Sequence, residues 1–184
     1  MKLLVIADDK LVGHRIPEYR PDLLVSLGDL PDKIILKVAR RCACRNILAV
    51  KGNHDSPKSF PSPIRDLHLK TVQFRGLTFG GFCGAWKYKP DGSHLFEQEE
   101  VEQHLARFPA VDIFVAHNSP RQVHDCEDGV HTGFTAFNNY IARVKPKLFF
   151  HGHQHHEIET NVGCTRVFCV FGYRYLTLPD MVRP

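Results

Sequence analysis

The sequence predicts an α/β protein in which a largely parallel sheet is joined by antiparallel strands. Three observations lead to this class. Short apolar runs recur along the chain, segments with helical spacing lie between several of them, and two further regions are rich in β-forming residues. Strands that alternate with helices favour a parallel sheet, whereas hairpins are antiparallel. We therefore expect a sandwich of mixed sheets.

Five apolar runs are expected to form buried strands. Each is short and nearly continuous in apolar residues, which is typical of a strand that is covered on both faces. The predicted strands are Leu3–Ala7, Leu23–Leu27, Ile47–Val50, Val111–Ala116 and Leu148–Phe150.

Helices are expected between these strands. Apolar residues recur at helical spacing between the second and third runs, and two later segments have a similar pattern. The proline at 146 ends the last of them, because the residue before a proline disfavours the helical region. The predicted helices are Pro31–Ala43, Phe96–Phe108 and Gly133–Val144.

Two regions carry the antiparallel signal. Thr71–Phe74 and Leu77–Phe82 flank Arg75 and Gly76, which predicts a hairpin around a glycine-containing turn. The tail from Val167 to Leu178 is rich in β-forming residues and is interrupted at Gly172. It is expected to form another hairpin or a bulged strand.

Composition sets limits on the class of protein. The chain has 184 residues, 43% of them hydrophobic and 24% charged, which fits one globular domain over residues 1–184. The N-terminal apolar run is too short for a signal peptide, so a cytoplasmic location is expected. The six cysteines include no CxxC pair and are expected to be free and mostly buried. A net charge of +4 does not by itself support binding to nucleic acid.

Polar residues follow every predicted parallel strand. Because βα loops emerge at the carboxyl ends of parallel strands, these residues are expected to meet at one edge. The five segments are Asp8-Asp9, Gly28-Asp29, Gly52-Asn53-His54-Asp55, His117-Asn118 and His151-Gly-His-Gln-His-His156.

The side chains in these loops predict a metal site. Carboxylate and amide oxygens with imidazole nitrogens suit borderline divalent ions such as manganese, iron, cobalt, nickel or zinc. The histidines argue against a cage for calcium or magnesium, which prefer oxygen ligands. A carboxylate placed between two ions would bridge them, as in two-metal sites for phosphoryl hydrolysis.

The order of these motifs resembles that of the calcineurin-like metallophosphoesterases, D…GDxxD…GNH[DE]…H…GHxH. Here it reads Asp8, Gly28-Asp29-Leu-Pro-Asp32, Gly52-Asn53-His54-Asp55, His117 and Gly152-His153-Gln154-His155. The resemblance spans residues 8 to 155. It implies a four-layer sandwich of two mixed β-sheets flanked by helices, with a dinuclear centre at one edge.

The resemblance also implies roles for individual residues. Asp29 is similar to the bridging carboxylate, and His54 to the non-ligand histidine that contacts the phosphoryl group and protonates the leaving oxygen. Asp32 would orient His54. One metal would be held by Asn53, His117 and His153 with Asp29, and the other by Asp8 and His155.

The implied activity is hydrolysis of a phosphodiester or phosphomonoester by a metal-activated hydroxide in line with the leaving group. The substrate is expected to be a phosphate ester, with diesters slightly preferred. A membrane partner is not expected, nucleic acid is not supported, and the oligomeric state cannot be read from the sequence. The cofactor is expected to be one or two divalent transition metal ions.

The first motif departs from the family, because Lys10 stands where the family has a histidine two residues after Asp8. A protonated lysine has no lone pair for a metal. Three accounts follow: two ions bind with water in the missing place, one ion binds while Lys10 supplies positive charge where the other ion would sit and binds the substrate, or the fold is a protein-binding scaffold, as in the retromer subunit that resembles this family. Asp9 and His14 are further candidates for the missing ligand.

Several other residues have two interpretations. Arg121 either contacts a substrate phosphate or is a solvated loop residue. His124 and His131, in the segment Gln122–Gly133, either line the substrate mouth or lie on the surface. Trp86 and Tyr88 either stack on a base or mark a partner site, or they anchor their loop, and His151 is expected to be structural.

Overall fold

The first sheet has five strands with a parallel centre. The structure is a computed structural model that describes residues 1–179, so the end of the predicted 1–184 domain lies outside the described residues. Strands β1 to β4 pair in parallel, and β13 pairs antiparallel with β1. In the order β13-β1-β2-β3-β4, the strands are Gly172–Thr177, Lys2–Ala7, Leu23–Ser26, Ile47–Ala49 and Ile64–Asp66.

The second sheet has six strands and the same plan. Its central strands β12, β10, β9 and β6 are parallel, and the antiparallel strands β11 and β5 lie at its edges. In the order β11-β12-β10-β9-β6-β5, the strands are Ile158–Val162, Thr165–Cys169, Leu148–His151, Ile113–Ala116, Leu77–Phe82 and Thr71–Phe74. A short pair, β7 (Ala85–Trp86) and β8 (Leu95–Phe96), stands apart from both sheets.

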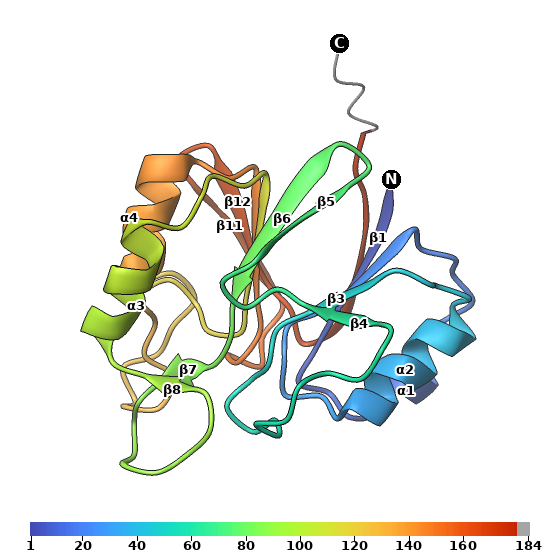
Figure 1. Ribbon diagram of the computed structural model, residues 1–184, viewed down its shortest axis with the longest axis horizontal. Coiled ribbons are helices and arrows are strands. Elements are labelled where there is room, and N and C mark those ends of the chain that lie inside the picture. Colours follow the sequence, from blue (N-terminus) through green and yellow to red (C-terminus); the bar gives the residue numbers. More distant parts are fainter. Residues whose placement is uncertain (180–184) are drawn as a thin grey trace.

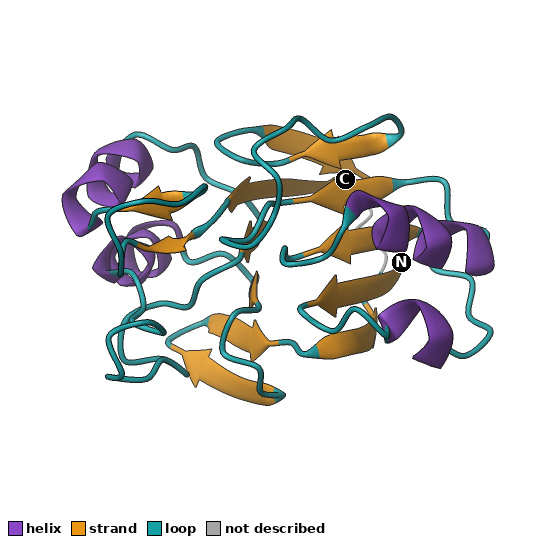
Figure 2. Cartoon of the chain, turned by 90° about the horizontal axis from the view of Figure 1, so that it is seen from below, coloured by secondary structure: helices purple, strands orange, loops and turns teal. Residues whose placement is uncertain are grey.

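Four helices flank the sheets in the described part of the chain. Figures 1 and 2 show the helices at opposite sides of the molecule with the strands between them. They are α1 (Val12–Arg15) and α2 (Asp32–Arg41) beside the first sheet, and α3 (Gln98–Ala106) and α4 (Thr135–Val144) beside the second. The predicted four-layer sandwich of two mixed sheets is confirmed.

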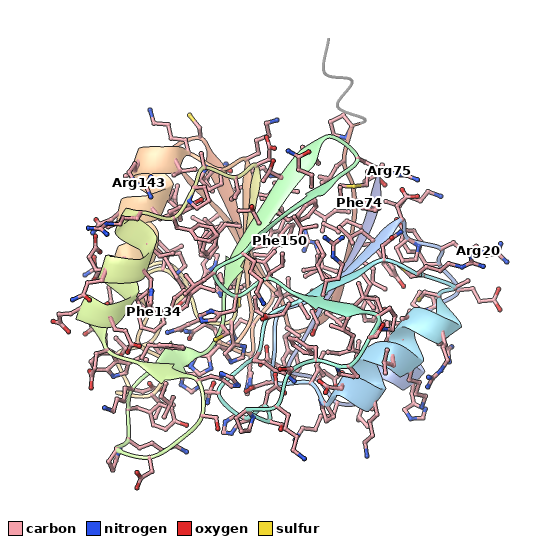
Figure 3. The ribbon with its side chains drawn as sticks, viewed as in Figure 1. Arg20, Phe74, Arg75, Phe134, Arg143 and Phe150 are labelled. Atoms are coloured by element: carbon pink, nitrogen blue, oxygen red, sulfur yellow. The ribbon has the colours of Figure 1, made fainter. Side chains whose placement is uncertain are left out.

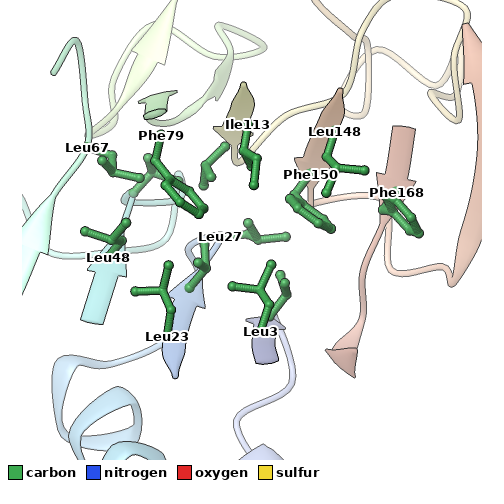
Figure 4. Packing of buried hydrophobic residues seen from close by; sticks show 14 of the residues in the cluster. Leu3, Leu23, Leu27, Leu48, Leu67, Phe79, Ile113, Leu148, Phe150 and Phe168 are labelled. Atoms are coloured by element: carbon green, nitrogen blue, oxygen red, sulfur yellow. The ribbon is translucent and has the colours of Figure 1, made fainter. Parts of the chain in front are cut away.

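Side chains alternate between the two faces of each strand, so the apolar core forms three clusters, one between the sheets and one under the helices on each side. Leu3 and Val5 of β1 point into the cluster between the sheets, whereas Leu4 and Ile6 point to the helix side. The residues labelled in Figure 4 come from both sheets and belong to the central cluster. Phe150 lies in that cluster and Phe134 in the cluster under α3 and α4 (Figure 3). Burial on both faces explains the continuous apolar runs.

The tail differs from the expected hairpin or bulged strand. Residues 167–178 are divided between β12, in the second sheet, and β13, in the first. Gly172 has a φ of 77°, which a glycine adopts easily at this crossing. The hairpin near the C-terminus is formed instead by β11 and β12, around a turn at Gly163. This strand crossing links the two sheets.

Other expectations can be checked on the described residues. The hairpin of β5 and β6 is confirmed. The cysteines are free thiols, and four of them are buried. Within residues 1–179, no helix has the length and apolar character needed to cross a membrane.

Candidate metal centre

The five predicted loops meet where the two sheets adjoin. Asp8, Asp29 and Asn53 follow β1, β2 and β3 of the first sheet, and His117 and His153 follow β9 and β10 of the second. Contacts between distant segments hold the loops together. His117 Nε2 lies 3.0 Å from Asn53 Oδ1, and the backbone N–H of His153 donates to Asp8 Oδ2 at 3.0 Å. The site is therefore built from both sheets.

Three candidate ligands converge at this edge. One atom each of Asp29, His117 and His153 lies within 4.8 Å of the others, and all three residues are buried. The oxygen of Asn53 joins them through His117. Its amide nitrogen donates to the hydroxyl of Tyr88 at 3.3 Å, which fixes the oxygen toward the histidine.

Hydrogen bonds define which nitrogen of His117 is available. Its Nδ1 lies 2.8 Å from the carbonyl oxygen of Leu27, so Nδ1 carries the proton and donates it. Burial lowers the pKa of His117, which keeps the ring neutral. The lone pair of Nε2 then faces the oxygens of Asn53 at 3.0 Å and Asp29 at 3.6 Å.

This arrangement favours a cation. A lone pair and two acceptor oxygens face one another, and buried acceptors need a donor or a positive charge between them. His153 is similar, because burial lowers its pKa to about 2 and its Nε2 lies 3.4 Å from the carbonyl oxygen of Val130. Donation from Nε2 leaves Nδ1 with a lone pair. The donor set fits a borderline divalent metal.

Close backbone approach is part of the site. A Cβ atom on Gly52 would lie 2.1 Å from Asp29 Oδ1 and 2.6 Å from its backbone nitrogen. A Cβ on Gly28 would lie 2.4 Å from the nitrogen of Gly52, and Gly28 has a φ of 102°. Only glycine at these positions lets the second and third loops touch.

The backbone of several site residues is strained. Asp8, Asp29, His153 and His155 have φ values between 53° and 65°, a region that non-glycine residues rarely adopt. Such residues persist where the surrounding structure fixes them, often at functional sites.

The second predicted ion position is less complete. Asp8 Oδ1 is buried without a hydrogen-bond partner among the described residues, and His155 Nε2 lies 3.8 Å from it. Burial, with the charge of Asp29 next, raises the pKa of Asp8 well above its usual value. Among the described residues, Asp8 and His155 belong to no group of three candidate metal ligands. Asp9 binds Arg15, and His14 lies 2.9 Å from Lys37 Nζ, so both are engaged elsewhere.

Lys10 and His54 line a cavity of about 310 Å³ beside Asp29. Both side chains belong to exposed residues, and the backbone N–H of His54 donates to Asp29 Oδ1 at 2.8 Å. Asp32 lines the same cavity, but its hydrogen bond goes to Lys51 Nζ at 2.8 Å. Within residues 1–179 no hydrogen bond joins Asp32 to His54, which differs from the expected orienting contact.

Arg121 is held by its own loop. Its guanidinium donates to Asp125 at 2.6 Å and to Glu127 at 3.0 Å, and these bonds raise its pKa. Two carboxylates compensate its charge in this structure, and a contact between Arg121 and a substrate phosphate stays a prediction. Asp125 and Glu127, four and six residues after Arg121, were the feature of the sequence that could have indicated these ion pairs.

Other residues of the same loop contact the candidate metal centre. The carboxylate of Asp128 accepts hydrogen bonds from the backbone N–H of Val130 and from the backbone and ring of His131. The ring centroid of His131 lies 4.9 Å from that of His153. Gln154 donates to the carbonyl oxygen of His131 at 2.9 Å. His131 therefore lies at the site, whereas His124 contacts the buried His151.

Asp55 is a further residue of the site, and no role was predicted for it from the sequence. Its Oδ2 accepts the backbone N–H groups of Gly52 and Asp29, each at 2.8 Å, and so joins two ligand loops. Burial raises its pKa to about 6. The feature of the sequence that could have indicated a place in the site is that Asp55 directly follows Asn53 and His54.

Comparisons with known proteins agree with this geometry. The family described as calcineurin-like phosphoesterase matches residues 4–157. A protein of Haemophilus influenzae, described as uncharacterized, is 26% identical over 174 residues and covers 76% of this chain and 75% of its own.

Solved structures share the fold at low identity. Phosphopantetheinyl hydrolase from Mycobacterium tuberculosis has a TM-score of 0.65 at 17% identity, covering 97% of this chain and 96% of its own. Vps29 from Entamoeba histolytica, in a complex with zinc, has a TM-score of 0.56 at 15% identity, covering 98% of this chain and 87% of its own.

Proposed function

The chain belongs to the calcineurin-like phosphoesterase family, and from this premise we propose that it is a metal-dependent hydrolase of phosphodiesters or phosphomonoesters. The observation that carries the proposal is the convergence of Asp29, His117 and His153 within 4.8 Å, with the oxygen of Asn53 facing them. We also propose that the protein acts in the cytoplasm on a phosphate ester.

A divalent ion bound by these residues would polarise the phosphoryl oxygens and lower the pKa of a bound water. The tautomer of His117 supports this assignment, because its proton is donated to Leu27 and its free lone pair faces Asp29. Asp8 and His155 are proposed as ligands for a second ion. Manganese, iron, zinc, cobalt and nickel all suit such ligands.

His54 is proposed as the proton donor to the leaving oxygen. It belongs to the exposed residues at the mouth of the cavity beside Asp29, and its backbone is anchored to that carboxylate. A positioned general acid typically contributes about 10²–10⁴ in rate. Lys10 and Lys51 line the same cavity and would place positive charge near a phosphate.

Asp32 is proposed to act through Lys51. The Nζ of Lys51 is 2.8 Å from the carboxylate, and its side chain is only 7% exposed. A buried ammonium needs a paired charge, so Asp32 stabilises a cation that lines the substrate cavity. This role replaces the expected hydrogen bond to His54.

The first experiment is a panel of chromogenic monoesters and diesters, assayed after reconstitution with each metal. Wild type is expected to hydrolyse at least one of them. His54→Ala is expected to lose about 10²–10⁴ in rate while it still binds metal. His104→Ala, an exposed histidine on α3, is the matched control. Metal-loaded protein that hydrolyses none of the esters would contradict the proposal.

The exposed Lys10 favours a second candidate, a catalytically weak or inactive protein-binding scaffold. Bound metal per chain should be measured in wild type and in Lys10→His. If Lys10 replaces the second ion, wild type binds one ion and Lys10→His binds two. Two ions in wild type would instead support water in the missing place. A scaffold would bind metal without hydrolysis of any ester in either protein.

A further inference from the structure

We infer that a second cavity beside the metal centre binds a phosphate group carried on the leaving part of the substrate. This inference rests on the proposed hydrolase function and narrows its substrate class. We call this cavity the remote cavity. Its volume is about 280 Å³, and its lining includes Lys51, Lys58, Phe60, Lys70, His94 and Phe96.

The remote cavity adjoins the cavity that contains His54. Lys51 lines both, and the segment from His54 to Phe60 runs along them, with His54 and Ser56 in the first and Pro57 to Phe60 in the second. His94 lies 3.4 Å from the carbonyl oxygen of Ser56, which connects the far wall to this segment. A substrate that extends past Lys51 would enter the remote cavity.

Lys51 provides a buried cation at the junction. Its side chain is 7% exposed, and its Nζ lies 3.8 Å from the ring centroid of Phe60. An ammonium has three N–H donors, and the hydrogen bond to Asp32 uses one of them. Lys51 can therefore donate to a ligand while its charge stays paired.

The other charges of the remote cavity favour an anion. Its lining includes three lysines and a single carboxylate, Asp66, which pairs with Lys70 at 2.8 Å. Lys58 makes no ion pair within residues 1–179, so its charge is uncompensated. His68 adds no negative charge, and burial lowers its pKa to about 4. Lys51 and Lys58 both line the remote cavity, so a phosphate bound there would meet two cations.

The position of His54 indicates which part of the substrate is bound there. His54 is proposed to protonate the leaving oxygen, and it begins the segment that leads to Lys58. The departing alcohol is therefore directed toward the remote cavity. The substrate class is an ester whose alcohol part carries a second phosphate.

The test uses esters that differ only in this second group. Propyl phosphate is compared with propane-1,3-diol bisphosphate, and pentane-1,5-diol bisphosphate samples a longer reach. Phosphate release gives kcat/KM for each. We expect wild type to prefer at least one bisphosphate by about tenfold, equivalent to about 1.4 kcal/mol.

Two variants locate the preference. Lys58→Gln is expected to reduce it to about threefold or less, because an exposed ion pair contributes modestly, and to leave kcat/KM for propyl phosphate unchanged. Lys2→Gln is the matched control. It removes the same charge at the first residue of β1, the end of that strand farther from Asp8 and the candidate metal centre. The control should keep the wild-type preference.

A binding measurement separates this inference from the proposed function. Propane-1,3-bisphosphonate and propylphosphonate cannot be hydrolysed, so calorimetry on metal-loaded protein compares their affinities without catalysis. Tighter binding of the bisphosphonate that Lys58→Gln reduces to about threefold or less supports the inference, even if no ester is hydrolysed. Equal affinity for the two phosphonates in wild type would overturn it, as would a preference that Lys58→Gln leaves as large as in wild type.

Discussion

Replacement of Gly52 by alanine tests whether close contact between two loops positions the proposed metal ligand Asp29. The new Cβ would lie 2.1 Å from Asp29 Oδ1, 2.6 Å from its backbone nitrogen and 2.7 Å from its Cγ. Ordinary contacts of this kind begin near 3.4 Å. The backbone nitrogen cannot rotate away as a side chain can, so the two loops must separate.

The magnitude follows from this overlap. Forcing an extra carbon into a packed site typically costs about 1–3 kcal/mol of unfolding free energy. For a chain of this length that corresponds to a fall in Tm of about 2–12 °C. Displacement of Asp29 also breaks its hydrogen bond with the backbone of His54. We expect metal affinity to fall by about tenfold or more, as for other disturbed supports of a ligand.

Calorimetric titration with manganese and zinc measures the affinity, and thermal unfolding in chelator measures the stability of the metal-free protein. Gly13→Ala is the control, because its Cβ would meet only the flexible side chain of Lys37, at 3.3 Å. Alanine in a helix is favourable, so this control should not lose stability. If Gly52→Ala binds metal as tightly as wild type, the proposed placement of Asp29 is wrong.

Three further predictions follow. Addition of metal at about 100 times its Kd should raise the unfolding free energy by about 2.7 kcal/mol. Differential scanning calorimetry with and without chelator would detect this as a higher Tm, and an unchanged Tm would argue against a metal site in the folded state. In metal-free protein, burial raises the pKa of Asp55 from 3.8 to about 6, so the contribution of this residue to the unfolding free energy should fall by up to about 3 kcal/mol as pH rises from about 4 to 6. The buried His117 and His153 have lowered pKa values and contribute with the opposite sign, so the test is the difference in unfolding free energy between wild type and Asp55→Asn in urea. That difference should shift against wild type as pH rises from about 4 to 6, and a constant difference would contradict the prediction. Asp128→Asn removes the charged partner of the His131 ring and should loosen the segment whose Val130 carbonyl oxygen faces His153. We expect metal affinity to fall by about tenfold, as measured by competition with a chelating dye. Unchanged affinity would mean that this segment does not support the site.

The sequence predicted most of the fold because its signals are local. A run such as Leu148–Phe150 is short and apolar throughout, and this alone indicates a strand that is covered on both faces. The carboxyl ends of parallel strands share one edge, so the loops with Asp29 and His117 could be placed together. The tail could not be assigned, because β13 pairs with β1 at the other end of the chain. Sheet membership depends on that distant partner.

The candidate site was predicted less fully for the same reason. The types of ligand were visible in the sequence, but the partner of a charged side chain depends on the assembled fold. Asp32 lies opposite Lys51, and Arg121 is enclosed by carboxylates of its own loop. Asp55 joins two loops through their backbone N–H groups, and no spacing rule identifies such a contact.

The candidate metal ligands come from both sheets, so an ion bound there would link the two sheets at one edge of the sandwich. Asp29 and His117 are far apart in the chain, yet their ligand atoms are neighbours. Loss of the ion would free the layers to separate at this end while the apolar centre stays closed. Amide hydrogen exchange in chelator should therefore accelerate first at the residues that follow β2 and β9, long before the middle of either strand.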